Sequence, residues 1–298
     1  MIFYNSAVSD TLSQGVVALA NVCAQRSVRA RVKVINDVSV GVHLLLRTVV
    51  RASDFSWQSG CGPSSLSASE VHLWSLSLDK PPERIQIFRD FLCSEEMRRA
   101  DGHHFQRDRD SFCLCRGYLR MLLGRYGGVA PGEVRFRTGD HGKLSLDPDF
   151  HEQNIGFNVS HSGRIAMIAL AKQRRLGVDV ERVRGAARID EISRSFFSSL
   201  EDKSIRALPE GMRVHAFYAC WTRKEAAVKA LGGSIAALAD RVIVSANPGG
   251  PAQLLRMPSD LDENTEWHLH DLPVSEGYAA ALCYSGSQAA VFLWQPNE

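Results

Sequence analysis

One alternating stretch decides the fold: Leu176-Gly177-Val178-Asp179-Val180-Glu181. The alternation predicts a β-strand with Asp179 and Glu181 on one face and Val178 and Val180 on the other. Two adjacent carboxylates repel each other unless a cation lies between them, and Mg²⁺ is the simplest cation with a preference for oxygen ligands. A half-buried strand with its acidic face in water explains the same pattern, so the sequence on either side must decide.

The composition is that of an ordinary globular protein, with 298 residues of which 45% are hydrophobic and 23% charged. The net charge of +2 gives no general reason to expect a nucleic-acid partner. Seven scattered cysteines, an odd number without a C-x-x-C pair, argue against a disulfide framework or a zinc site. No apolar run is long enough to span a membrane. We therefore expect a cytoplasmic protein with neither nucleic-acid nor membrane partners.

The first 69 residues differ from the rest because they are basic, poor in acids and end in a Ser- and Gly-rich run at residues 56–65. Three explanations fit this composition: an organelle transit peptide, a poorly structured extension, or translated sequence upstream of the true start. We expect residues 1–69 to be an extension outside the catalytic fold, and assign it no chemistry.

Regular patterns begin at Glu70 and predict alternating groups of strands and helices. Strands are expected at residues 71–78, 133–138, 157–160, 165–171, 176–181, 242–244, 267–272, 278–283 and 290–294. Helices are expected at residues 85–92, from Ser94, at 107–126 and at 189–197. A further helix is expected to start at the capping box Ser198-Ser199-Leu200-Glu201, and another to cover residues 213–231. Gly127-Gly128 and Gly232-Gly233 are expected to end the helices at 107–126 and 213–231. The strand at 157–160 is expected to run into a polar loop, and residues 172–175 to form a hairpin turn. The order predicts an α+β fold with two similar-sized halves, residues 70–175 and 176–298.

The helix predicted at residues 213–231 carries a third acid. On a helical wheel Glu225 falls within an apolar stripe, Lys229 falls at the edge of that stripe, and Arg223 points the opposite way. The apolar members are Val214, Phe217, Trp221 and Val228. An (i, i+4) surface ion pair between Glu225 and Lys229 is the ordinary explanation. A carboxylate on a buried stripe needs a partner, however, and a cation held by the acidic strand is one.

Several cationic side chains are candidates to bind the phosphates that Mg²⁺ commonly accompanies. They are Arg99, Lys143 on a glycine-flanked turn, His161 after Ser160, and Lys229. Ser160 and His161 do not form a nucleophile–base pair, because adjacent side chains on an extended chain point apart. The sequence contains no G-x-x-x-x-G-K-[ST] motif, which excludes a P-loop enzyme.

Four motifs in register resemble those of the 4′-phosphopantetheinyl transferases of the Sfp type. The motifs are Phe157-Asn158-Val159-Ser160-His161-Ser162, Gly177-Val178-Asp179-Val180-Glu181, Phe196-Phe197-Ser198 and Trp221-Thr222-Arg223-Lys224-Glu225-Ala226. Gly142-Lys143 stands where the family has a G-K-P turn, although Leu144 replaces the proline. The resemblance covers residues 70–294 and excludes the N-terminal extension.

The resemblance implies transfer of the phosphopantetheine arm of coenzyme A to a serine of an apo acyl or peptidyl carrier protein. The other product is adenosine 3′,5′-bisphosphate. The resemblance also implies a monomer with two α+β halves related by a pseudo-two-fold axis. Coenzyme A and Mg²⁺ would lie in the cleft between the halves.

The resemblance gives the candidate residues specific roles. Asp179, Glu181 and Glu225 would hold Mg²⁺, and Glu225, directly or through a water, would be the base for the carrier serine. Lys229 would stabilise or protonate the leaving phosphate, and both it and Asp179 would contact coenzyme A. Lys143 and His161, with Ser160 nearby, would bind the 3′-phosphate, and Arg99 would be a further coenzyme A contact.

Two other classes of protein fit parts of the sequence. An Mg²⁺-dependent phosphohydrolase of a nucleotide-like substrate would use the same carboxylates with water as the nucleophile. A non-catalytic carrier-binding relative would need none of them, which makes the complete set of Asp179, Glu181, Glu225 and Lys229 an argument against that class.

Overall fold

The computed structural model describes residues 55–60, 62–139, 143–148, 154–185, 189–258 and 265–296. The elements named below belong to one compact unit within Val49–Glu298. Helices and strands alternate in groups through this unit, which confirms the predicted α+β class. The pseudo-two-fold relation between the halves stays a prediction. Within the described residues, no helix combines the length and the apolar character that a membrane crossing requires.

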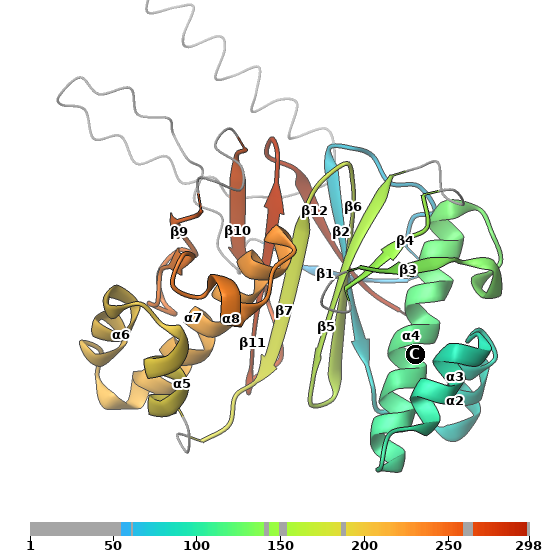
Figure 1. Cartoon of the computed structure of the whole chain (residues 1–298), viewed down its shortest axis with the longest axis horizontal. Helices are drawn as coiled ribbons and strands as arrows, with labels where there is room; N and C mark the ends of the chain where they lie inside the picture. The colour runs from blue at the N-terminus through green and yellow to red at the C-terminus, as the bar shows by residue number, and fades with distance from the viewer. Residues whose placement is uncertain are drawn as a thin grey trace, which may run out of the picture. The chain divides into compact units, whose positions relative to one another are not determined.

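Two larger sheets form the centre of this unit (Figure 1). The five-stranded sheet has the order β1 (Trp57–Ser59), β12 (Ala290–Gln295), β2 (Glu70–Ser77), β6 (Ile165–Lys172), β5 (Ile155–Ser162). The three-stranded sheet has the order β10 (Trp267–Asp271), β11 (Tyr278–Ser285), β7 (Leu176–Arg182) and is antiparallel throughout. Two small hairpins complete the strands: β3 (Phe136–Thr138) with β4 (Leu144–Leu146), and β8 (Ile243–Val244) with β9 (Leu254–Arg256).

The helices fall into two groups on opposite sides of the sheets (Figure 1). One group comprises α2 (Pro82–Arg89), α3 (Ser94–Asp101) and α4 (Gln106–Gly127), followed by the short 3₁₀ helix η2 (Pro131–Glu133). The other comprises α5 (Ile189–Phe196), α6 (Ser199–Arg206), α7 (Glu210–Leu231) and α8 (Ile235–Leu238). The two 22-residue helices, α4 and α7, carry the largest buried faces of their groups.

Three apolar clusters hold these layers together. The first joins α4, through Leu119 and Leu123, to the outer face of the five-stranded sheet. The second joins α7 to β11, β8 and β10. The third lies between the two sheets and includes Val178 and Val180 of β7. The predicted alternation of β7 is therefore confirmed, because both valines are fully buried on the face away from the acids.

Local signals in the sequence set the ends of several helices. Ser198 is the N-cap of α6: its hydroxyl accepts from the backbone N–H of Glu201, whose carboxylate accepts from the N–H of Ser198. Gly128 and Gly232 follow α4 and α7 in the left-handed conformation, with φ of 71° and 81°. These ends match the predicted ones.

Two predictions about β5 and β7 are wrong. β6 and β7 do not form a hairpin, because β7 pairs with β11 in the other sheet. Residues 161 and 162 do not form a polar loop, because β5 continues through Ser162 and pairs with β6 along its whole length. The turn lies at Gly163 and Arg164 instead.

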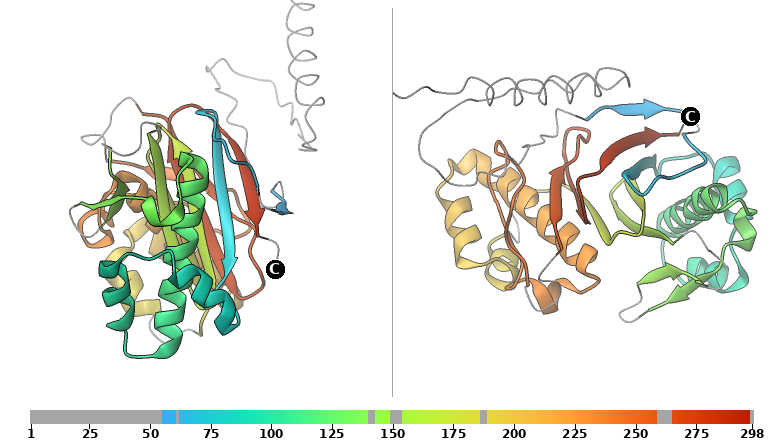
Figure 2. Two further views of the ribbon diagram at one scale, coloured as in Figure 1. Left: turned by 90° about the vertical axis from the view of Figure 1, so that its right-hand side faces the viewer. Right: turned by 90° about the horizontal axis from the view of Figure 1, so that it is seen from above.

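The boundary expected at residue 69 also needs correction. Residues 57–59 form β1, which pairs in parallel with β12, and the indole nitrogen of Trp57 donates to the carbonyl oxygen of Pro273 at 2.8 Å. Leu66 is buried in the first apolar cluster. Figure 2 shows β1 beside β12, which itself returns from the C-terminal part of the chain to pair with β2. Of the extension expected over residues 1–69, only positions 1–54 and 61 lie outside the described residues. The other positions belong to the fold.

Candidate active site

The strand β7 and the helix α7 bring the predicted carboxylates together because they pack unusually closely. Gly177 is the reason: a Cβ atom at this position would lie 2.1 Å from the carbonyl oxygen of Ala226 and 2.5 Å from the backbone nitrogen of Ala230. Only glycine allows this approach. On the same face of β7, two and four residues further along, Asp179 and Glu181 point toward the same side of the strand.

Asp179 is the most buried acid of the group, with 3% of its surface exposed. Its Oδ1 accepts hydrogen bonds from Lys229 Nζ at 2.6 Å and from the Ser160 hydroxyl at 2.8 Å. Its Oδ2 is buried and has no hydrogen-bond partner. Burial raises the pKa of Asp179, and the hydrogen bonds from Lys229 and Ser160 act against that rise. One oxygen of this carboxylate is therefore still without a partner.

Glu181 and Glu225 lie in the same electrostatic environment. Burial is the main cause of a raised pKa at both, and the charge of Asp179 raises both further. Glu181 Oε2 accepts a hydrogen bond from the Ser162 hydroxyl at 2.7 Å. Glu225 has neither a hydrogen bond nor an ion pair with any described residue. The alternative explanation, an (i, i+4) ion pair with Lys229, is not observed, because Lys229 binds Asp179 instead.

The chemistry of this group of side chains suits a hard divalent cation. All the donors are carboxylate oxygens, and one of them, Oδ2 of Asp179, is buried without a partner. Within the described ranges, no three His, Cys, Asp or Glu side chains already converge as a metal cluster. The set Asp179, Glu181 and Glu225 thus fits a cation by its chemistry and remains a prediction as a ligand shell.

The helix wheel of α7 was only partly right. Arg223, which was expected to face away from the core, is fully buried, as is Lys224. The half-buried residues of α7 include a row at helical spacing: Val214, Tyr218, Trp221, Glu225 and Lys229. The wheel misplaced Arg223 because other elements cover α7 on nearly all sides. The row of half-buried residues along the helix therefore faces the site and not the core.

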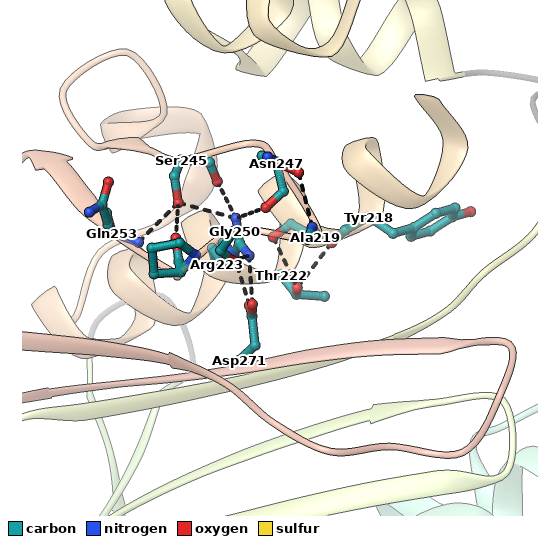
Figure 3. Close-up of polar contacts among 11 residues, drawn as sticks. Tyr218, Ala219, Thr222, Arg223, Ser245, Asn247, Gly250, Gln253 and Asp271 are labelled. Atoms are coloured by element: carbon teal, nitrogen blue, oxygen red, sulfur yellow. Dashed lines mark hydrogen bonds and ion pairs between the residues drawn. The ribbon is translucent and has the colours of Figure 1, made fainter. Parts of the chain in front are cut away.

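Partners from distant loops compensate the buried charge of Arg223 (Figure 3). Its guanidinium bonds both carboxylate oxygens of Asp271, at 2.8 and 2.5 Å. It also donates to the carbonyl oxygens of Ser245, Asn247 and Gly250. Bidentate pairing with full hydrogen bonding is what makes a buried guanidinium tolerable. Asp271 ends β10, so the network ties α7 to the edge strand of the three-stranded sheet that lies farthest from β7.

A cavity of about 830 Å³ lies between β5 and the α3–α4 region. Asp179, Glu181, Glu225 and Lys229 are not among the residues that line it. Arg182 and Lys143 connect the cavity to them, since Arg182 follows Glu181 in β7 and Lys143 bonds the backbone of Lys229. Its lining is strongly basic, with Asp108 as the acid among the residues that line it. The basic residues are Arg99, His103, Arg107, Arg116, Lys143, His161, Arg164, Arg182 and Arg184. Such a surface favours a ligand with several negative charges.

Three of the predicted phosphate ligands line this cavity: Arg99, Lys143 and His161. Lys143 Nζ donates to the carbonyl oxygen of Lys229 at 2.8 Å, and burial lowers the pKa of Lys143. His161 is exposed to the cavity; partial burial in its wall, and then the charge of Lys229, lower its pKa. The turn residues 140–142 lie outside the described residues.

Ser160 does not join these three ligands. Its side chain points to the other face of β5, where its hydroxyl donates to Asp179 and accepts from the N–H of Val180 at 3.3 Å. The prediction that Ser160 lies near the 3′-phosphate therefore has no support in the geometry of its side chain.

The sequence analysis missed several residues at the site. Arg182 and Arg184 follow the acidic strand directly and reach the cavity, and their alternation along the chain was the available signal. Ser162 was read as loop, although Asn158, Ser160 and Ser162 alternate as a strand requires.

Clustered carboxylates beside a basic cavity define an enzyme that handles a phosphorylated, polyanionic substrate. The comparison with known families is more specific. The model described as "4'-phosphopantetheinyl transferase superfamily" matches residues 175–283, and the model described as "4'-phosphopantetheinyl transferase, N-terminal" matches residues 80–173. The chain belongs to the 4′-phosphopantetheinyl transferase superfamily, as the motifs indicated.

Relatives with assigned names agree with this family. The 4′-phosphopantetheinyl transferase HetI of Nostoc sp. is 35% identical over 233 residues, which cover 78% of this chain and 93% of HetI. Sfp of Bacillus subtilis is 25% identical, over 72% of this chain and 92% of its own. A solved ACPS–CoA complex, described as from Chronobacterium ammoniagenes, covers 39% of this chain at 22% identity and a TM-score of 0.31, a similarity too low to support an argument.

Proposed function

We propose that this protein transfers the 4′-phosphopantetheine arm of coenzyme A to a serine hydroxyl of an apo acyl or peptidyl carrier protein, with Mg²⁺ as the required cation. One observation carries the proposal: the carboxylates of β7 and α7 lie beside a strongly basic cavity, in the region that the family models match. The cavity supplies cations for the phosphates of coenzyme A, and the acids supply a metal site and a base.

The carboxylates of Asp179, Glu181 and Glu225 are the residues that would hold Mg²⁺. When bound, the ion would neutralise the charge that grows on the leaving phosphate. The unpartnered Oδ2 of Asp179 and the unpaired carboxylate of Glu225 support this assignment.

The proposed reaction assigns proton transfers to two residues of this chain. The carrier serine oxygen forms a bond to the phosphorus that bears the pantetheine arm, and the bond to the bridging oxygen breaks, releasing adenosine 3′,5′-bisphosphate. Glu225, alone or through a water, accepts the serine proton as the general base. Lys229 stabilises or protonates the leaving phosphate from its place beside Asp179.

The cavity residues would bind and orient coenzyme A. Lys143 and His161 would bind the 3′-phosphate, since both line the cavity. Arg99 would contribute a further contact from α3. Its guanidinium lies 5.9 Å from the ring centre of Phe112, a cation–π geometry that holds the side chain against the cavity wall.

A mass-shift assay tests the proposal directly. The protein is incubated with coenzyme A and Mg²⁺, with and without each of a panel of apo-carriers, and carrier mass and bisphosphate are both measured. Transfer predicts a carrier heavier by the phosphopantetheine arm, and bisphosphate release only when a carrier is present. Bisphosphate released without a carrier would instead indicate the phosphohydrolase, and no reaction with any carrier would contradict the proposal.

Variants of the acids test the assigned roles. We expect Asp179→Ala and Glu225→Gln each to reduce transfer by about 10²-fold or more while circular dichroism spectra stay native. Glu210→Gln is the matched control, because Glu210 is an exposed glutamate in the first turn of the same helix. Wild-type rates in either site variant would refute the assignment.

A further inference from the structure

The strands β5 and β7 lie side by side without backbone hydrogen bonds between them, because they belong to different sheets. Side chains of β5 bridge the gap in place of carbonyl oxygens. The amide oxygen of Asn158 accepts from the N–H of Val178 at 2.9 Å, and the hydroxyl of Ser162 accepts from the N–H of Arg182 at 3.1 Å. Ser160 makes the equivalent bond midway between them. These bridges satisfy buried N–H groups that would otherwise lack partners.

The bridge at Ser162 also determines where its proton points. A hydroxyl has one hydrogen to donate and lone pairs to accept with. Because the Ser162 oxygen accepts from the N–H of Arg182, its hydrogen is free to be donated, and it is donated to Glu181 Oε2 at 2.7 Å. The backbone of β7 thus orients a serine that in turn holds a carboxylate of β7.

Asn158 provides a natural comparison within the same strand. It bridges to β7 through its amide oxygen in the same way but bonds no carboxylate. The bridging and carboxylate-holding roles are therefore separable by position: Asn158 performs the first, and Ser162 performs both.

We propose that Ser162 is a positioning residue that holds the carboxylate of Glu181 in the orientation needed to bind the divalent cation. This inference rests on the proposed function, since it assigns Glu181 to the metal. Ser162 engages Oε2 and leaves Oε1 of Glu181 for the cation. Without the hydroxyl, Glu181 loses its hydrogen bond at Oε2, and the charges of Lys229 and Arg184 then act on a carboxylate that is no longer held. Groups that orient metal ligands typically affect metal affinity by about 10- to 100-fold.

Direct metal binding is the test, with Mn²⁺ as the probe and the full-length protein free of coenzyme A and carrier. Free Mn²⁺ is measured by electron paramagnetic resonance during titration. We expect Ser162→Ala to raise the Kd for Mn²⁺ by about 10-fold, and Ser162→Thr, which keeps the hydroxyl, to stay within about two-fold of wild type. Asn158→Ala should leave the Kd unchanged, since it removes only a bridge. Melting temperatures of all variants establish that each is folded.

A second readout separates positioning from general damage. In the transfer assay, Ser162→Ala should need about 10-fold more Mg²⁺ for half-maximal rate, while the KM for coenzyme A and the rate at saturating Mg²⁺ change little. In a Glu181→Gln background, Ser162→Ala should have no further effect on the Kd for Mn²⁺, because the carboxylate that Ser162 holds has been replaced by an amide.

Several outcomes would overturn the role of Ser162 alone: a wild-type Kd for Ser162→Ala, an equal loss for Ser162→Thr, or an equal loss for Asn158→Ala. None of these three outcomes bears on the proposed transfer reaction of the wild-type protein. If the wild-type protein neither binds Mn²⁺ nor modifies any apo-carrier, the proposed function itself fails, and the role of Ser162 fails with it.

Discussion

Replacing Gly177 by alanine tests whether the contact between β7 and α7 assembles the site. The new Cβ would lie 2.1 Å from the carbonyl oxygen of Ala226, where ordinary contact begins near 3.4 Å. It would also lie 2.5 Å from the nitrogen of Ala230. Both atoms are backbone and neither rotates away, so α7 must move from β7 by about 1.3 Å.

The displacement should affect stability and activity differently. Overpacking of a core costs about 1–3 kcal/mol, and a clash with backbone belongs at the upper end of that range. A loss of about 3 kcal/mol lowers the melting temperature of a protein of this size by about 6–12 °C. Movement of Glu225 and Lys229 relative to Asp179 by about 1 Å reduces the rate by about 10²-fold.

Differential scanning fluorimetry and the carrier mass-shift assay measure the two effects. Gly211→Ala is the control, because Gly211 lies on the same helix with nothing within 4 Å of the added Cβ. It should leave the rate unchanged and keep or raise the melting temperature, since alanine favours helix. A Gly177→Ala protein with wild-type melting temperature and rate would refute the packing argument.

Two further predictions concern buried charge. Arg223→Ala should lower the free energy of unfolding by about 3–5 kcal/mol, because it leaves Asp271 and several carbonyl oxygens unpaired. Arg206→Ala, which removes an exposed ion pair, should cost less than about 1 kcal/mol in the same urea titration. Burial lowers the pKa of His270 from 6.5 to about 4, so between these values the unfolded chain binds a proton that the folded chain does not. Unfolding free energy should therefore fall by up to about 1.4 kcal/mol per pH unit as the pH drops through that window, and His270→Phe should make this fall shallower; an unchanged pH dependence would contradict the assignment.

Local patterns were the part of this structure that the sequence could predict. The alternation around Asp179 required only the two-residue period of a strand, and the capping box at Ser198 only a three-residue spacing. The glycine that ends α7, Gly232, followed from the left-handed conformation that other residues adopt with difficulty. Each of these features depends on neighbours along the chain.

The features that could not be predicted depend on partners far along the chain. Apolar periodicity could not show that Arg223 is buried, because its acceptors lie at Ser245 and Asp271. The short connection between β6 and β7 would normally make a hairpin. Both edges of β6 are already occupied, however, one by β2 and the other by β5. Ser160 and His161 are adjacent in a strand and so face opposite ways, a rule that the assignment of both to the 3′-phosphate did not apply. Glu225 as a metal ligand stays a prediction, and the helical wheel gave a wrong account of which faces of α7 are covered.

The parallel pairing of β12 with both β1 and β2 has a consequence for how the protein is made. The five-stranded sheet places the last strand of the chain between two of its first strands. During synthesis on a ribosome, β2 and β6 emerge early, but the edge of β2 stays open until residues 290–295 have left the exit tunnel. An open edge is where strands from other chains add. Nascent chains of this protein should therefore be most exposed to mispairing late in translation, and shortening the C-terminus by a few residues should reduce soluble yield more than it alters the chemistry of the site.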